Sequence, residues 1–250
     1  MLAISLSCIS IVSAQFSSAD LTANVNTLKY AVPFLTFPTL ASNQSLGYIK
    51  SLSLDNKESA HFGNPSLMGL MEDKISIAAS YTPTLRETLP NANLFGVAGY
   101  YRLNRENSVG FDFTYFSLGN ITYNKPGNPP QTLNPNEKAA SINYSRLLSS
   151  NSSVGVSLKY IISDLTEGAP HGGMPSSTGT SLATDISYSS RIHTPNESIN
   201  QEFGVGINNL GTKLAYAKNS DKDFIPTSLN IGYSIKYQIN STQSVFFGYG

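Results

Sequence analysis

Ser108-Val109-Gly110-Phe111-Asp112-Phe113-Thr114-Tyr115-Phe116-Ser117-Leu118 is the stretch that decides the fold. Successive side chains of a β-strand point to opposite faces, so Val109, Phe111, Phe113 and Tyr115 share one face. Gly110, Asp112 and Thr114 fall on the other face. This run predicts a strand with one apolar and one polar face.

The same alternation recurs along most of the chain from about residue 74 onward. Turn-rich segments of Asn, Gly, Pro and Ser separate the runs. The apolar members are Phe95, Val97, Tyr101 and Leu103; Val154, Val156, Leu158, Tyr160 and Ile162; Leu182, Ile186 and Tyr188; Phe203, Val205 and Ile207; and Leu229, Ile231, Tyr233, Ile235 and Tyr237. Weaker examples are Lys74 to Thr82, Glu137 to Leu147, and Ser244 to the end. We expect an all-β, antiparallel fold of about nine strands.

Strand length and connection length distinguish a transmembrane barrel from a soluble sandwich, whose strands also alternate. Each run has about 9 to 12 residues, which suits a tilted strand crossing a bilayer. Short connections, such as 104–107 and 148–152, take turns with long ones, such as 119–136 and 164–180. Outer-membrane barrels show this asymmetry, with tight turns inside and long loops outside. We therefore expect an outer-membrane β-barrel.

Composition agrees with that class. Only 13% of the 250 residues are charged, with 16 Lys+Arg and 16 Asp+Glu, about half the share in an ordinary soluble domain. Beyond the first fifteen positions the chain has no run of about 18 apolar residues, so no transmembrane helix is expected. The balanced charge, without a basic cluster, argues against nucleic acid as a partner.

The chain divides into three expected parts. Residues 1–14 read as a signal peptide, with Cys8 in its apolar core and Val12 and Ala14 as small cleavage-site residues. Residues 15–73 are expected to form a periplasmic or plug segment, and residues 74–250 the barrel. Nine strands cannot close a bacterial barrel, which has an even number, so we expect a C-terminally truncated version of a larger barrel.

Tyrosines are expected to mark the two membrane interfaces, where a ring with a polar tip is favoured. Tyr81, Tyr115 and Tyr160 belong near the outer rim. Tyr101, Tyr144, Tyr188 and Tyr237 belong near the inner one.

Several stretches resemble the PorV family of the type IX secretion system, a branch of the FadL-like barrels of Bacteroidetes outer membranes. The most specific are Tyr115 to Thr122 and Asn134 to Glu137. Further stretches are Ala31 to Leu35, Asn64-Pro65, Ser80 to Pro83 with Leu85-Arg86, Gly99 to Leu103, Leu158 to Leu165, Asn208 to Gly211 and Pro226 to Leu229. The sequence departs from the family pattern at residues 40–47 and 62–65, both in the expected plug.

The resemblance implies a FadL-like barrel of about fourteen strands in the bacterial outer membrane. It also implies a carrier that binds the C-terminal signal domain of type IX cargo, receives the cargo from the translocon and delivers it to the surface sortase complex. The partners would be these proteins and outer-membrane lipid. Two alternatives stay open: a FadL-like channel for hydrophobic small molecules, favoured if apolar residues converge on a pocket, and a surface adhesion barrel.

Catalytic chemistry is not indicated. The sequence lacks a nucleophile elbow and a phosphate-binding glycine loop. His61, His171 and His193 are far apart, in the expected plug, an outer loop and an inner turn, so a shared metal site is not expected. We expect no enzyme activity, cofactor or metal. Arg102, Asp112, Lys159, Asp185 and Lys236 should face the barrel interior.

The connection after the strand ending near Ile162 is the most suggestive partner surface, because it is long and carries a methionine able to fit an apolar pocket. The residues expected to contact partners are Asp164, Leu165, Pro170, His171, Gly172, Gly173 and Met174. The alternative for any one of them is a loop residue without a partner.

Overall fold

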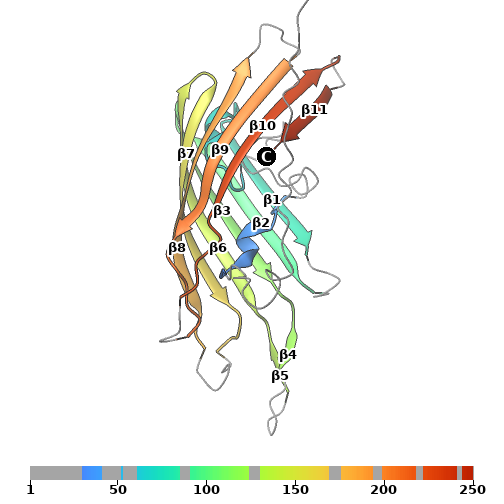
Figure 1. The fold of residues 1–250 in the computed structure, drawn as a ribbon, viewed down its shortest axis with the longest axis vertical. Coiled ribbons are helices and arrows are strands. Elements are labelled where there is room, and N and C mark those ends of the chain that lie inside the picture. The colour runs from blue at the N-terminus through green and yellow to red at the C-terminus, as the bar shows by residue number, and fades with distance from the viewer. Residues whose placement is uncertain are drawn as a thin grey trace, which may run out of the picture.

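Nine antiparallel strands form one sheet in the part of the chain that the computed structural model describes (Figure 1). That part comprises residues 30–40, 52, 61–84, 91–123, 130–168, 176–193, 199–217, 222–240 and 244–249. The strands are β1 (Ile75–Pro83), β2 (Asn93–Arg102), β3 (Asn107–Ser117), β6 (Asn136–Ser149), β7 (Ser152–Asp164), β8 (Gly179–His193), β9 (Ile199–Gly211), β10 (Ser228–Gln238) and β11 (Ser244–Tyr249). The signal peptide expected at residues 1–14 lies outside the described residues.

The predicted antiparallel strands are confirmed, each paired with its sequence neighbour in the sheet from β1 to β11. The register places apolar residues opposite one another, as with Tyr81, Phe95 and Tyr115 on β1, β2 and β3. Since a slip of one residue would turn every side chain to the other face, the alternation itself fixes this pairing. Within the described residues, β1 and β11 are the two edges of the sheet.

A small hairpin was not expected from the sequence. β4 (Ile121–Tyr123) and β5 (Gln131–Leu133) form a separate two-stranded sheet, which extends beyond β3 and β6 in Figure 1. Runs of three residues are too short for a period of two to be recognised. The hairpin lies inside the connection predicted at residues 119–136.

The two ends of the sheet differ, as the spacing predicts. β2–β3 and β6–β7 are joined by short turns at one end, which we call the short-turn end. The connections 118–135, 165–178 and 212–227 all lie at the opposite end, which we call the long-connection end. The two ends of the sheet therefore differ in the length of the connections between their strands.

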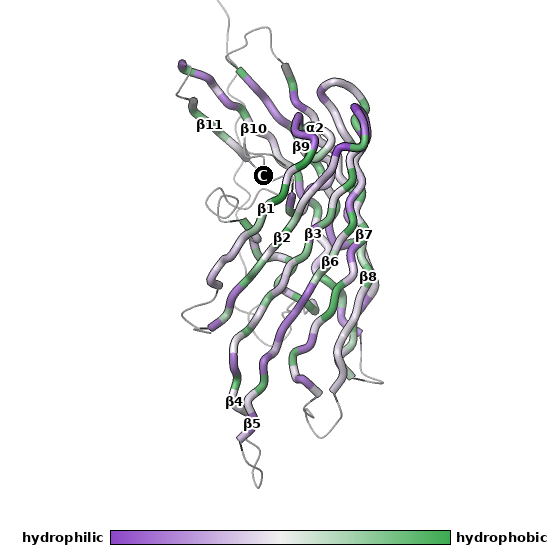
Figure 2. Tube along the Cα trace, turned by 180° about the vertical axis from the view of Figure 1, so that it is seen from behind, coloured by the Kyte–Doolittle hydropathy of each residue, from purple (hydrophilic) through white to green (hydrophobic). Residues whose placement is uncertain are grey.

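The outer face of the sheet is apolar and exposed. Ile142 on β6 is 66% exposed, and Phe247 on β11 is 69% exposed. Hydropathy alternates along the strands in Figure 2, because every second residue belongs to the inner face. The predicted tyrosines on this outer face fall into two rows. The row at the long-connection end holds Tyr81, Tyr115 and Tyr160, and the row at the short-turn end holds Tyr101, Tyr144, Tyr188 and Tyr237.

The inner face is covered by the N-terminal segment, defined here as described residues 30–40 and 61–71. Near the long-connection end it forms the 3-10 helix η1 (Pro33–Thr36), and near the short-turn end the helical turn α2 (Leu67–Leu70). Phe34 of η1 is 1% exposed and stacks on Phe116 of β3 at 6.3 Å between ring centroids. The apolar cluster around Phe34 contains Ala31, Val32, Ala92, Leu94, Phe116, Ala139, Ile161, Ala183, Leu214 and Ile225.

At the short-turn end the contact is tighter and more polar. Gly155 of β7 lies against the backbone of Pro65 and Ser66, where a Cβ atom would overlap. The hydroxyls of Ser145 and Ser153 occupy the space beside Gly69. Small residues on the strands therefore let the chain of the N-terminal segment approach the sheet directly.

No helix in the described residues is long and apolar enough to cross a membrane.

Candidate functional site

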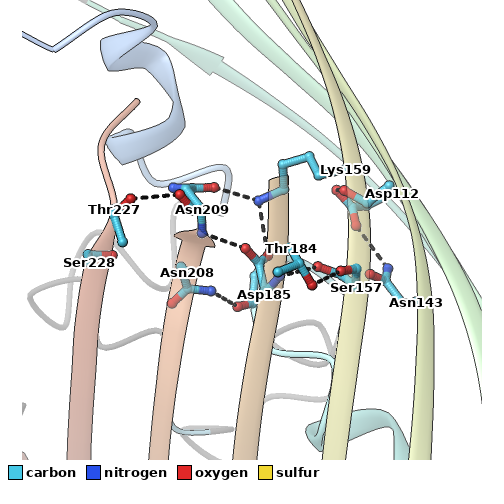
Figure 3. Close-up of polar contacts among 12 residues, drawn as sticks. Asp112, Asn143, Ser157, Lys159, Thr184, Asp185, Asn208, Asn209, Thr227 and Ser228 are labelled. Carbon is cyan, nitrogen blue, oxygen red and sulfur yellow. Dashed lines mark hydrogen bonds and ion pairs between the residues drawn. The ribbon is translucent and has the colours of Figure 1, made fainter. Parts of the chain in front are cut away.

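A buried ion pair lies at the middle of the inner face (Figure 3). Lys159 of β7 donates from Nζ to Oδ2 of Asp185 on β8 at 3.0 Å. The same ammonium donates to Oδ1 of Asn209 on β9 at 2.7 Å. Side-chain exposure is 12% for Lys159 and 3% for Asp185, so both charges depend on protein partners for their solvation.

A β-bulge in β9 brings Asn209 to this pair. Asn208 and Asn209 together stand opposite Asp185, because the register shifts by one residue between Thr184 and Ile186. Asn209 has a φ of 56°, a left-handed conformation that asparagine tolerates better than most side chains do. The bulge turns both asparagine side chains to the inner face, where both are buried.

Every polar group of Asn209 is hydrogen-bonded. Its N–H donates to Oδ1 of Asp185 at 2.7 Å, and its Nδ2 donates to the carbonyl of Pro226 at 3.1 Å. Thr227 donates from its hydroxyl to the Asn209 carbonyl at 2.8 Å. The bulge is therefore tied to the start of β10 as well as to Lys159.

A second carboxylate lies beside the ion pair. Asp112 of β3 accepts hydrogen bonds from Ser141 at 3.1 Å and from Asn143 at 2.9 Å, both on β6. Each carboxylate oxygen of Asp112 thus accepts a hydrogen bond from a neutral donor. Polar side chains of five consecutive strands of the sheet, from β3 to β9, thus form one belt across the inner face.

The N-terminal segment is hydrogen-bonded to this belt and to serines of β8 nearer the short-turn end. Asn208 donates from Nδ2 to the carbonyl of Gly63 at 3.0 Å. Asn64 donates to the hydroxyl of Ser189 at 3.2 Å, and the N–H of Ser66 donates to the hydroxyl of Ser187 at 3.1 Å. Serines of the inner face, which alternation alone assigns only to the polar face, are therefore among the groups that hold the segment.

Two small cavities lie between the N-terminal segment and the sheet. One, of about 20 Å³, is lined by polar groups that include His61, Asn64, Asp112 and Asp185. The other, of about 50 Å³, lies between Phe34, Phe37 and Phe62 on one side and Asp112, Ala139 and Lys159 on the other. Sites for drug-sized ligands have about 300 to 1,000 Å³, so both spaces are too small for such a ligand, and the polar one suits water molecules.

Of the five charged residues predicted on the inner face, the structure brings three together. Lys159 and Asp185 are in direct contact, and Asp112 lines the same cavity. Arg102 and Lys236 lie near the short-turn ends of β2 and β10, away from this group. Asn208 and Asn209 were not predicted for this site, although two polar residues in succession interrupt the alternation of β9 and signal a bulge.

The predicted partner-binding connection is described at its two ends only. Asp164, the last residue of β7, accepts a hydrogen bond from the N–H of Glu167 at 2.9 Å and so stabilises the turn that follows. Leu165 is half-buried in that turn. Where the connection returns, the N–H of Ser177 donates to the carbonyl of Tyr216 at 2.7 Å. Pro170, His171, Gly172, Gly173 and Met174 lie outside the described residues.

The described part of the chain contains no group of three or more His, Cys, Asp or Glu residues arranged to hold a metal ion. His61 of the N-terminal segment packs on Tyr100 at 5.2 Å between ring centroids and lies 3.1 Å from the hydroxyl of Ser76. His171 is outside the described residues.

Comparison with known protein families matches residues 20–248 to a family model described as type IX secretion system protein PorV. The match runs from before the N-terminal segment to β11, so one family model accounts for both the segment and the sheet. No curated protein matches the chain.

Proposed function

This chain belongs to the PorV family of type IX secretion system proteins, and from that premise we propose that it is an outer-membrane carrier of secreted proteins. It binds exported proteins by their C-terminal signal domain, takes them from the translocon and delivers them to the sortase complex at the cell surface. The family is one of outer-membrane secretion components rather than enzymes. The family match is the observation that carries the proposal.

The exposed apolar face supports the location in the outer membrane. The strands β1 to β10 of the large sheet have 9 to 15 residues, and about 9 to 11 tilted residues cross a bilayer. Side chains such as Ile77 and Leu229, exposed to 69% and 64%, would be covered by lipid. In this arrangement the sheet is part of a barrel wall, and the N-terminal segment is the plug that fills the lumen.

The tyrosine rows and neighbouring lysines fit the two interfaces of such a membrane. Lys138 lies over the ring of Tyr115 at 5.7 Å at one end, and Lys74 lies over Tyr101 at 5.8 Å at the other. Lysine with aromatic side chains is favoured at the level of lipid headgroups. The long-connection end then faces the cell exterior and the short-turn end faces the periplasm.

The connections at the outer end are the surfaces that we assign to partner proteins. They follow β3, β7 and β9 at one end of the sheet, and binding residues are commonly carried by loops on such a scaffold. The connection that contains Asp164, Leu165, Pro170, His171, Gly172, Gly173 and Met174 is the first to test.

The lining of the inner face favours a carrier over a channel for hydrophobic small molecules. Apolar residues converging on a pocket would favour a channel. In the described residues, the belt around Lys159, Asp112 and Asp185 instead puts buried charge and a small polar cavity behind the N-terminal segment, and the more apolar cavity beside Phe34 has only about 50 Å³. We therefore place the activity on the outer connections rather than in the lumen.

Copurification tests the carrier proposal. A C-terminally tagged chain is purified in mild detergent from the outer membrane of its own organism, and the accompanying proteins are identified by mass spectrometry. The tagged chain with residues 169–175 replaced by a Gly-Ser stretch of equal length serves as the matched variant. We expect proteins bearing type IX signal domains to accompany the unaltered chain and to be depleted with the variant. Recovery of the folded, membrane-inserted chain without such proteins would contradict the proposal.

A further inference from the structure

The bulge in β9 points two neighbouring side chains in the same direction but bonds them to different parts of the molecule. Asn208 donates to the carbonyl of Gly63 in the N-terminal segment. Asn209 donates to the carbonyl of Pro226 in the connection between β9 and β10. In a regular strand these two side chains would lie on opposite faces. The extra residue of the bulge is what joins both contacts on the inner face.

The bulge has little freedom to adjust one contact without disturbing the other. Asn208 and Asn209 are 3% and 2% exposed, and the left-handed φ of Asn209 is maintained by surrounding bonds. The N–H and side-chain oxygen of Asn209 are fixed by Asp185 and Lys159. A shift of the bulge would therefore leave buried polar groups unsatisfied, at a cost that exceeds that of one exposed hydrogen bond.

The same connection also contacts the N-terminal segment at a second place. The N–H of Ala31 donates to the carbonyl of Phe224 at 2.8 Å, and Tyr30 and Phe224 form a parallel bridge. Leu214 and Asp223 pair with each other through two backbone hydrogen bonds of 2.9 Å. The N-terminal segment therefore contacts the bulge at Gly63 and the connection at Ala31. The bulge in turn contacts the connection at Pro226.

We propose that this bulge mechanically couples the N-terminal segment to the connection between β9 and β10. A displacement of residues 222–227 loosens the segment at Gly63, and a displacement of the segment loosens the connection. The coupling is reciprocal, since both contacts require the same conformation of the bulge. It is a property of the fold and does not depend on which partner the outer connections bind.

Hydrogen–deuterium exchange of the full chain in detergent tests the coupling. Asn208→Ala removes the contact to the segment. Asn209→Gly tolerates the left-handed backbone and removes the amide that contacts both the connection and Lys159. One hydrogen bond is worth about 1 kcal/mol net, so each local opening equilibrium should rise about fivefold. We expect faster exchange in both reporter peptides, 61–66 and 222–227, with either variant.

Two variants serve as controls. Asn143→Ala removes a half-buried amide that donates to Asp112 on β3, and it should leave both reporter peptides unchanged. Asn230→Ala removes the bond that β10 makes to Asn208 while leaving the Gly63 bond in place, and it should leave peptide 61–66 unchanged. The peptide 139–145 of β6 reports global unfolding, and if Asn208→Ala unfolds the sheet, the milder Asn208→Ser replaces it.

Exchange that rises only in the segment with Asn208→Ala, and only in the connection with Asn209→Gly, would overturn the coupling. It would leave the proposed carrier function untouched, because partner binding by the outer connections needs no coupling. If cargo no longer copurified while exchange rose in both peptides with either variant, the carrier function would be contradicted and the coupling would stand.

Discussion

Arginine placed at the centre of the outer face is the sharpest probe of the membrane assignment. Ile142 lies on β6 six residues after Asn136 and seven before Ser149, and it is 66% exposed. Its register partners, Phe111 on β3 and Leu158 on β7, are also exposed on this face. The substitution Ile142→Arg therefore puts a charge in the middle of an apolar surface.

The expected cost follows from the position of Ile142 along the strand. A strand rises about 3.4 Å per residue, so six or seven residues tilted by about 40° span roughly 16 to 18 Å of height. Ile142 is thus about equally far from both ends of β6 and lies close to the midplane of an apolar band about 25 to 30 Å tall. At that depth arginine on a barrel costs about 2 to 4 kcal/mol. On a water-exposed sheet the same change would alter stability by no more than about 0.5 kcal/mol.

The assay is urea unfolding of the chain refolded into lipid vesicles, with the free energy of unfolding compared between variants. Thr132→Arg is the matched control, since Thr132 is exposed on the β4–β5 hairpin outside the large sheet. We expect a loss of about 2 to 4 kcal/mol for Ile142→Arg and almost none for the control. A loss below about 0.5 kcal/mol for Ile142→Arg would refute the assignment of this face to lipid.

Three further substitutions test the packing behind the sheet, each by the urea midpoint of the refolded chain. Gly155→Ala should cost about 1 to 3 kcal/mol because its Cβ would overlap the backbone of the N-terminal segment; Gly206→Ala, whose nearest contact would be 3.4 Å, should be nearly neutral, and equal effects would contradict the packing. Lys159→Met should cost about 3 to 5 kcal/mol because it leaves Asp185 buried without its cation; adding Asp185→Leu should recover much of the loss, and no recovery would show that the pair is not the cause. Phe34→Ala should cost about 3 to 5 kcal/mol by opening a cavity in the cluster at the long-connection end, and an unchanged midpoint would mean that the segment does not stabilise the sheet.

The strands could be predicted because their information is local. In β3 the run from Val109 to Tyr115 already separates the two faces, and the register with β2 and β6 follows from matching those faces. The same logic placed the tyrosine rows at the two ends. It could not find β4 and β5, because runs of three residues carry too little periodicity.

The inner face was predictable in polarity but not in its contacts. Asp112, Lys159 and Asp185 could be assigned to the inner face from alternation alone. Their grouping depends on register across several strands and on the β9 bulge, neither of which is visible in one segment. The role of Gly155 and of Ser187 was equally hidden, because it arises from residues about 90 and 120 positions earlier in the chain.

The partner-binding surface depends on a different kind of information. Asp164 stabilises the first turn of its connection, and this is a local structural role that the sequence could suggest. What the connection binds is decided by shape and chemistry that only a complex reveals. The family match therefore carries the functional conclusion, and the long-connection end says where to test it.

Direct binding of a purified type IX C-terminal signal domain to the chain in lipid nanodiscs tests the central claim. The labelled signal domain is titrated with the chain, and a cargo lacking that domain serves as the control. The carrier account predicts saturable binding of the signal domain, weakened when residues 169–175 are replaced, and no binding of the control. A folded chain in nanodiscs that binds neither protein would contradict the account.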